Sequence, residues 1–306
     1  MPSRADGPAP RPLLAVVGDL VEDVVVWASE PVRRGTDTAA RVFRTRGGSG
    51  ANVAALAAGL TPTRFIGCVG EDAAGSALVA ELERTGVEVR VQRRGRTGAV
   101  VLLVDVDGER TMFPDRAAAA MLDRVDPGWI DGIGWVHAPA YGLERDPMRG
   151  ALVALLRTAR ERGIPVSLDA SSTGLLAGIG LDGFRALVST IAPDVCFAND
   201  DEARLLGIAE GGEAAGALAP VVVVKHGPAP SEVFEDGRLV ARVPVEPVPG
   251  IRDLTGAGDA FAAGWIAAAM RGEDAEAACL AGHRRAASVL GSPGTSSMPA
   301  IDVNQS

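Results

Sequence analysis

The sequence predicts an α/β protein in which helices flank a central, mostly parallel sheet and a small second β-sheet forms a lid. Short apolar runs alternate with segments of helical periodicity along most of the chain, which is typical of a parallel sheet with helices on both faces. Polar residues follow several of the apolar runs, at the sheet edge where open α/β proteins bind ligands. Two segments, about residues 20–46 and 97–115, show strand patterns without helical periodicity, and we expect them to build the lid.

In the first half of the chain, the apolar run 13–17 ends at Gly18-Asp19 and predicts a buried strand. A helix is expected from near Ala51, because apolar side chains then recur on one helical face. Gly86 favours the end of a helix over 71–85. The Asp-Gly pair at 107–108 predicts a hairpin. The strands expected in this half cover residues 13–17, 24–27, 38–45, 65–69, 97–106 and 110–113.

In the second half, strand and helix patterns alternate, as in repeated crossover units of a parallel sheet. The expected strands cover residues 135–138, 165–169, 194–198 and 221–225. The expected helices cover residues 147–162, 181–190, 200–206, 260–270 and 274–290. The last third of the chain is therefore predicted to be mostly helical.

The amino-acid composition argues against several classes of function. With 39 acidic and 30 basic residues the net charge is −9, which argues against nucleic-acid or anionic membrane partners. Three scattered cysteines without a CxxC pair fit a reducing cytoplasm. No apolar run reaches the length of a membrane span, roughly 18 residues. Residues 1–11 are Pro-rich and expected to be a disordered leader, and residues 12–306 are expected to form one domain.

The segment Asp253-Leu254-Thr255-Gly256-Ala257-Gly258-Asp259 precedes an apolar, helix-forming run. Backbone N–H groups at a helix N-terminus bind anions, and glycines let a phosphate approach the backbone closely. The amides of Gly256, Ala257 and Gly258 are therefore candidates to hold charge on a transferred phosphoryl group. Asp259, in the first helical turn, is a candidate base for a substrate hydroxyl. For the Gly-x-Gly triplet alone, a simple capped turn is the alternative.

The seven residues together resemble the C-terminal signature of the ribokinase-like (PfkB) carbohydrate kinase family, Asp-Thr-x-Gly-Ala-Gly-Asp. Leu254 departs from it, because a hydroxyl residue is common there. The resemblance spans about residues 13–300 and implies a kinase that uses ATP and Mg²⁺. It also implies nucleotide contacts by Thr255 and a monovalent cation site near Asp253.

Gly47-Gly48-Ser49-Gly50-Ala51-Asn52 resembles the family's N-terminal signature. Glycine N–H groups and an Asn amide offer hydrogen bonds without bulk, which suits a polyol. A flexible connection capped by Asn is the alternative reading of this segment alone. The resemblance implies that Gly47, Gly48 and Asn52 grip substrate hydroxyls, and that Asp23 is the substrate-binding aspartate.

Asn199-Asp200-Asp201-Glu202 resembles the family's Asn-x-x-Glu motif, which implies Asn199 near the nucleotide phosphates and Glu202 on Mg²⁺ through water. A helix N-terminus rich in acids is the alternative. Lys225-His226-Gly227 matches a stretch along the family's ATP site, so Lys225 and Gly227 are assigned to nucleotide binding. Asp169 either faces the phosphates or is a simple strand-end acid.

The acceptor is expected to be a small sugar-like molecule. Ribose itself is disfavoured, because Val21 stands where ribokinase-type pockets have Asn two residues before the aspartate. Arg110 and Arg116 flank Thr111-Met112-Phe113-Pro114 and could form a fork for a carboxylate or phosphate of the substrate. Surface arginines that serve solubility are the alternative. The resemblance also implies a homodimer formed through the lid strands.

Three other functions compete with that of a sugar kinase. Lys225 is the only lysine, so no Gly-Lys-Ser/Thr phosphate loop exists. A nucleoside kinase of the same family stays open, because Trp27, Phe43 and Phe113 lie in lid strands where a base could stack. A non-catalytic metabolite-binding protein on this fold also stays open, since fold alone does not fix function.

Overall fold

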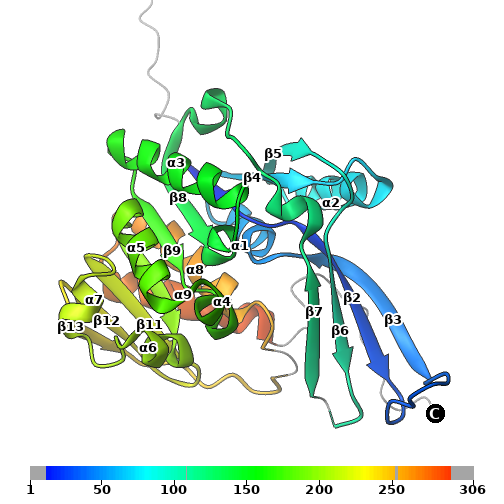
Figure 1. Cartoon of the computed structure of the whole chain (residues 1–306). Helices are drawn as coiled ribbons and strands as arrows, with labels where there is room; N and C mark the ends of the chain where they lie inside the picture. Colours follow the sequence, from blue (N-terminus) through cyan, green and yellow to red (C-terminus); the bar gives the residue numbers. More distant parts are fainter. Residues whose placement is uncertain (1–11, 108, 252–253, 291–306) are drawn as a thin grey trace, which may run out of the picture.

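The computed structural model describes residues 12–107, 109–251 and 254–290. The expected leader 1–11 and the expected cation site near Asp253 lie outside the described residues. The described part contains one large and one small sheet, with helices packed on the large one (Figure 1). The predicted fold class is confirmed.

The large sheet has nine strands in the order β13-β12-β11-β10-β9-β8-β1-β4-β5. Neighbours from β11 to β5 are parallel, whereas β11, β12 and β13 pair antiparallel. The strands are β1 (Leu13–Val17), β4 (Thr63–Val69), β5 (Glu88–Arg93), β8 (Ile133–Pro139), β9 (Val166–Asp169), β10 (Val195–Asn199), β11 (Val221–His226), β12 (Ala229–Glu235) and β13 (Arg238–Val243).

Two hydrophobic cores cover the two faces of this sheet, as the alternation of side chains along a strand requires. In β1, Ala15 and Val17 enter one core, and Leu14 and Val16 enter the other. Helices of the first core are α3 (Met148–Glu161), α4 (Thr173–Ile179), α5 (Leu181–Ile191), α6 (Asp200–Leu206) and α7 (Gly212–Gly216). Helices of the second are α1 (Ser49–Ala58), α2 (Ala73–Arg84), α8 (Ala257–Ala269) and α9 (Ala275–Leu290).

The small sheet has four strands in the order β3-β2-β6-β7, and it projects from one side of the body (Figure 1). Its strands are β2 (Val21–Ala28), β3 (Ala40–Gly47), β6 (Ala99–Val104) and β7 (Arg110–Asp115). One of its faces buries Val25, Val100 and Leu102 against Phe43. Three short 3₁₀ helices, η1 (Ala117–Ala120), η2 (Pro127–Ile130) and η3 (Ala140–Leu143), complete the described elements.

Several predicted boundaries were wrong. Helix α1 begins at Ser49 rather than Ala51, because Gly48 takes a φ of +98° and turns the chain directly into the helix. Strands β5, β12 and β13 and helices α4 and α7 were missed. β5 alternates charged and apolar side chains and stays half exposed at the sheet edge, and the charged hairpin β12–β13 forms the other edge.

Taken singly, the helices of the described residues are too short or too polar to cross a membrane; only α4 and α5 joined, across a 93° bend, reach the length and composition of a span.

Candidate active site

The predicted site residues gather at the carboxyl ends of the parallel strands, facing the N-termini of α1 and α8. β1 ends before Asp19, β9 ends at Asp169, and β11 carries Lys225. Asp259, in the first turn of α8, contacts Ser49 and Asn52 of α1, which lie 210 and 207 positions away in the sequence. Crevices at this edge are where open α/β sheets bind ligands.

Helix α8 begins as the glycine-rich segment predicts. Gly256 is its N-cap residue with a φ of +77°, a left-handed conformation that glycine adopts without strain. The N–H of Ala257 donates to the carbonyl of Leu254 at 3.2 Å. The N–H of Ala257, one of the three predicted anion-binding amides, is therefore already used within the turn. Gly258 is exposed at the helix end.

Two side chains of α1 hold the carboxylate of Asp259. Ser49 Oγ donates to Asp259 Oδ1 at 2.6 Å, and Asn52 Nδ2 donates to Asp259 Oδ2 at 3.0 Å. Burial raises the pKa of Asp259 to about 7; the two hydrogen bonds oppose this shift, and the charges of Asp169 and Asp19 add to it. This carboxyl group is thus oriented and titrates near neutral pH.

Asp23 lies directly over Gly47. A Cβ added to Gly47 would stand 2.1 Å from Asp23 Oδ1, so only glycine fits there. Burial, with the Asp19 charge, raises the pKa of Asp23 to about 7, and Arg46 opposes this shift. The buried Arg46 also donates from Nη1 to Asn52 Oδ1 at 3.1 Å. Asn52 is therefore held at both ends of its amide, between Arg46 and Asp259.

Asp19 ties β1 to the start of α1. Its side chain is 6% exposed, and its Oδ1 accepts from the N–H of Gly50 at 3.1 Å. A Cβ on Gly48 would lie 2.4 Å from the carbonyl oxygen of Asp19. The Gly47-Gly48 pair thus lets Asp19, Asp23 and the start of α1 approach one another closely.

Lys225 lies close to the α8 N-terminus. Its Nζ forms an ion pair with Asp169 Oδ2 at 2.8 Å. A Cβ added to Gly258 would stand 3.5 Å from this Nζ, so the ammonium group borders the predicted anion-binding turn. Burial lowers the pKa of Lys225, but the facing Asp169 carboxylate outweighs burial and the net pKa is raised. Lys225 is thus a fixed positive charge at the end of β11.

Asn199 and Glu202 form a capping box at the start of α6. Asn199 Oδ1 accepts from the N–H of Glu202 at 2.9 Å, and Glu202 Oε2 accepts from the N–H of Asn199 at 2.8 Å. Burial, with the charge of Asp169, raises the pKa of Glu202 to about 7. Glu202 therefore has a structural role in addition to any metal contact. Gly227, with a φ of +60°, lies between β11 and β12.

Arg110 and Arg116 do not form the expected fork. Arg110 is the first residue of β7 and Arg116 directly follows its last, so the two lie about 20 Å apart at the usual rise of a strand. Arg110 Nη1 donates to Thr255 Oγ1 at 2.6 Å, which links the small sheet to the loop before α8. Arg116 Nη1 instead donates to Asp19 Oδ2 at 2.5 Å. The two arginines thus belong to different parts of the site.

Sequence reasoning missed Ser49, Asp19 and Arg46 as members of this cluster. Ser49 lies inside the segment singled out above, but a lone serine among glycines gives no sign of its partner 210 positions away. Arg46 lies in a strand rich in arginines, and only the fold shows that its side chain is 3% exposed. Of these three residues, only Asp19 could have been identified from the sequence, because it follows a buried strand.

Comparison with known proteins identifies the family to which this chain belongs. The sequence pattern of the pfkB family carbohydrate kinases matches residues 11–301. An ATP-dependent ribose-1-phosphate kinase of Halopiger xanaduensis is 36% identical over 264 residues, covering 84% of each chain. A fructokinase of Klebsiella pneumoniae is 30% identical over 268 residues, covering 82% of each. A probable sugar kinase of Rhizobium etli has a similar structure, with a TM-score of 0.82 at 21% identity over 94% of this chain and 96% of that one.

Proposed function

This chain belongs to the pfkB family of carbohydrate kinases, and we propose that it transfers the terminal phosphoryl group of ATP to a hydroxyl of a small sugar with Asp259 as general base. The observation that carries the proposal is the placement of Asp259 in the first turn of α8, held by Ser49 and Asn52. A base must lie beside both the attacking hydroxyl and the phosphoryl group, and this carboxylate borders the anion-binding turn.

In the proposed reaction the acceptor hydroxyl donates its proton to Asp259 as its oxygen forms a bond to the terminal phosphorus of ATP, and the bond from that phosphorus to the leaving ADP breaks. Negative charge on the transferred group lies at the positive end of the α8 dipole, beside the exposed amide of Gly258. Lys225 supplies a full positive charge at the same place. Asp23, Gly47, Gly48 and Asn52 would hold the other sugar hydroxyls, and Asn199, Gly227 and Thr255 would line the nucleotide site.

The residues present fit a Mg²⁺ ion carried by the nucleotide. Asp169, Asn199 and Glu202 offer the oxygen ligands that this ion prefers. No group of three or more His, Cys, Asp or Glu in the described ranges could hold a metal by itself, so phosphate oxygens and water would complete the shell. Glu202 would contact the ion through water. The bound ion neutralises phosphate charge.

Activity is expected to fall as the pH drops below about 7, because the base works only when ionised and the pKa of Asp259 is raised to about 7. The measurement is kcat/KM for the acceptor between about pH 5.5 and 9, which should rise with unit slope to a plateau. Asp23 titrates in the same range, so Asp23→Asn is the control: it should lower kcat/KM and keep the acid limb. A profile that is flat in the wild type, or loses its limb in Asp23→Asn, contradicts the assignment.

A sugar acceptor is favoured over a nucleoside by the aromatic side chains of the site. Phe43 packs inside the small sheet, and Phe113 shares a face with Val101 and Val24, opposite the face that contains Asp23. Tyr141 lies at the site, but Arg116 already stacks on its ring at 4.1 Å. Trp27, four residues beyond Asp23 along β2, is the remaining aromatic side chain of those considered for stacking on a base. The preorganised Asp259 also favours a catalyst over a protein that only binds metabolites.

We further propose that the small sheet acts as a lid that excludes water from the transferred phosphoryl group. Asp23 lies over Gly47, the last residue of β3 before the turn into α1, and Arg110 extends from this sheet to Thr255 in the loop before α8. Such a lid favours transfer to the sugar over hydrolysis. Free, buried cysteines support a cytoplasmic location for this reaction.

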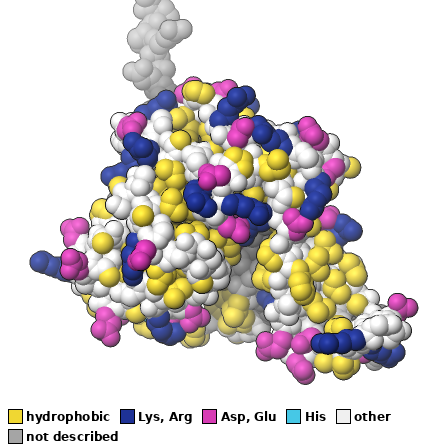
Figure 2. Space-filling model, viewed as in Figure 1, with side chains coloured by type: hydrophobic (Ala, Val, Ile, Leu, Met, Phe, Trp, Pro, Cys, Tyr) yellow, Lys and Arg dark blue, Asp and Glu magenta, His cyan; other side chains and the backbone are white. Residues whose placement is uncertain are grey.

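The outer face of the small sheet is proposed to pair with a second copy of the chain. Val24, Val101 and Phe113 form one row across it, and Val26, Val42 and Leu103 form the next. Val42 is 59% and Phe113 55% exposed, and Figure 2 shows hydrophobic side chains spread over these strands. A large exposed apolar patch marks an interaction site.

Phe113→Asp is expected to convert a wild-type dimer into a monomer, because the introduced carboxylate would be buried without a partner. Size-exclusion chromatography with light scattering measures this. Leu239→Asp, at an exposed position on β13, is the matched control and should leave the dimer intact. A monomeric wild type, or a dimeric Phe113→Asp variant, would refute the interface.

A further inference from the structure

Arg46 is a buried positive charge that the proposed reaction does not use. Its side chain is 3% exposed, although it belongs to β3 of the small sheet. Its Nε lies 3.9 Å from Glu81 Oε1 on α2, and its Nη1 donates to Asn52 Oδ1 on α1 at 3.1 Å. A buried cation is costly unless its neighbours compensate it, so these contacts decide what the residue does.

Arg46 lies behind the proposed sugar site rather than in it. Successive side chains of a strand point to opposite faces of the sheet. In the β2–β3 ladder Arg46 lies opposite Glu22. Asp23 lies opposite Thr45, and therefore on the other face of the small sheet. The guanidinium group thus contacts Asn52 from the face opposite to Asp23, and it reaches the site through this amide.

The neighbours of Asn52 fix the orientation of its amide. A guanidinium group only donates hydrogen bonds, and an ionised carboxylate only accepts them. The amide oxygen must therefore face Arg46 and the amide nitrogen must face Asp259. This is the arrangement observed, with 3.1 Å from Arg46 Nη1 to Asn52 Oδ1 and 3.0 Å from Asn52 Nδ2 to Asp259 Oδ2. If the amide turned over, its oxygen would face the carboxylate and its N–H groups would face the guanidinium group.

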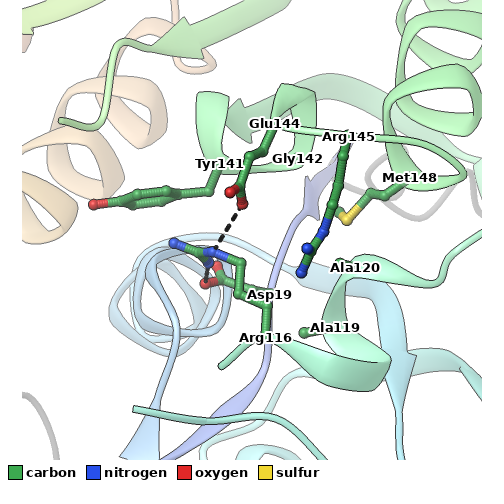
Figure 3. A pocket seen from close by; sticks show the side chains of 9 residues that line it. All are labelled: Asp19, Arg116, Ala119, Ala120, Tyr141, Gly142, Glu144, Arg145 and Met148. Atoms are coloured by element: carbon green, nitrogen blue, oxygen red, sulfur yellow. Dashed lines mark hydrogen bonds and ion pairs between the residues drawn. The ribbon is translucent and has the colours of Figure 1, made fainter. Parts of the chain in front are cut away.

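The backbone that carries Asn52 is anchored independently of Arg46. Asp19 Oδ1 accepts from the N–H of Gly50 at 3.1 Å, and Arg116 donates to the other oxygen of Asp19. Figure 3 shows the guanidinium group of Arg116 against the Asp19 carboxylate. The start of α1 is therefore held from the end of β1. Arg46 adds the direction of one amide group, on which the second hydrogen bond to Asp259 depends.

We propose that Arg46 is a positioning residue of the phosphoryl transfer, which orients the Asn52 amide so that this amide and Ser49 hold Asp259 in one direction. This inference rests on the proposed kinase function and adds a residue to its machinery. With Ser49 on Oδ1 and Asn52 on Oδ2, the carboxylate cannot rotate. Without Arg46 the amide can turn over, and the base then loses one of its two supports. A small misplacement of a reacting group is enough to lower the rate.

Arg46→Met is expected to lower kcat about tenfold, the scale of one charge-assisted hydrogen bond, and to leave KM for Mg-ATP unchanged. The measurement is ADP release at about pH 9, where Asp259 is ionised, with the sugar that the wild type phosphorylates fastest. Arg46→Lys should retain more of kcat than Arg46→Met, since an ammonium group also only donates. Arg44→Met is the matched control. Arg44 lies two positions earlier on the same face of β3 and is 67% exposed, so its replacement should leave kcat unchanged.

A double-mutant cycle tests whether Arg46 acts through Asn52. Asn52→Ala removes the amide that Arg46 orients. When Arg46→Met is added to Asn52→Ala, it should therefore lower kcat by less than about twofold. A residue that only stabilises the fold would cost as much in this background as in the wild type. The melting temperature of each variant is measured in parallel.

The possible results separate the two claims. A kcat for Arg46→Met equal to that of Arg44→Met, or an undiminished loss in the Asn52→Ala background, overturns the positioning role and leaves the kinase function intact. If Arg46→Met melts well below the wild type, Arg46→Gln takes its place, because the Gln amide both donates and accepts and no longer fixes Asn52. Failure of the kinase function is a different result: the wild type phosphorylates no acceptor, or Asp259→Asn retains full activity.

Discussion

Replacing Asp259 by Asn is expected to lower kcat at least a hundredfold, because general base catalysis contributes about 10²–10⁴ in rate. Asn has nearly the shape of Asp and can still accept a hydrogen bond from Ser49, but it cannot take a proton. The measurement is ADP release at saturating Mg-ATP and acceptor, at about pH 8, where the base is ionised.

The melting temperature separates lost chemistry from lost structure. Burial raises the pKa of Asp259 to about 7, so the ionised form is disfavoured in the folded protein. The protonated carboxyl group of Asp259 therefore favours the folded protein at low pH, and this contribution to stability is lost as the pH rises through about 7. A neutral Asn removes this penalty at about pH 8 but loses the hydrogen bond from Asn52, so the two effects oppose each other and the variant should melt close to wild type. Asp182→Asn, at a fully exposed carboxylate on α5, is the matched control for kcat. A kcat for Asp259→Asn within a few-fold of wild type would contradict the base assignment.

Lys225→Met is expected to lower kcat/KM for ATP by about a hundredfold, the scale on which one preorganised electrostatic group stabilises a transition state. The variant loses the positive charge beside Gly258 and leaves Asp169 unpaired. Steady-state kinetics with varied Mg-ATP measures the effect.

Pairing this variant with Asp169→Asn tests the cause. A buried pair broken on one side destabilises a protein, whereas removal of both charges is often close to neutral. The double variant should therefore recover the melting temperature lost by Lys225→Met. Its activity should stay well below that of Asp169→Asn alone, which already carries the loss of a proposed Mg²⁺ ligand. If the double variant is as active as Asp169→Asn, Lys225 is a structural partner of Asp169 and not a phosphate contact.

The sequence predicted the fold class and most of the parallel sheet because buried strands and amphipathic helices have clear periodicities. It predicted α6 over 200–206 with the observed boundaries, since the acidic first turn and the following glycine mark both ends. It did not predict β5, β12 or β13. β5 and β13 are the two edge strands of the large sheet, and β12 lies next to β13. All three carry charged side chains, which weaken the apolar pattern that identifies a strand.

The site was predictable where a glycine-rich turn precedes a helix, and not where side chains meet through the fold. Asp259 could be identified from its own segment, whereas its partner Ser49 could not. The expected pairing of Arg110 with Arg116 was wrong for a related reason. Nearness in sequence suggested one binding fork, but the extended strand β7 separates the two residues and gives each a different partner, Thr255 and Asp19.

The most direct test of the central claim is identification of the product formed by the wild-type enzyme with Mg-ATP and a panel of sugars and sugar phosphates. Phosphorus NMR of the reaction mixture, with ADP measured in parallel, reports which molecule receives the phosphoryl group. One new phosphate ester on an acceptor hydroxyl is expected for each ADP formed. Release of ADP with inorganic phosphate and no new ester, or no turnover of any acceptor, would contradict it.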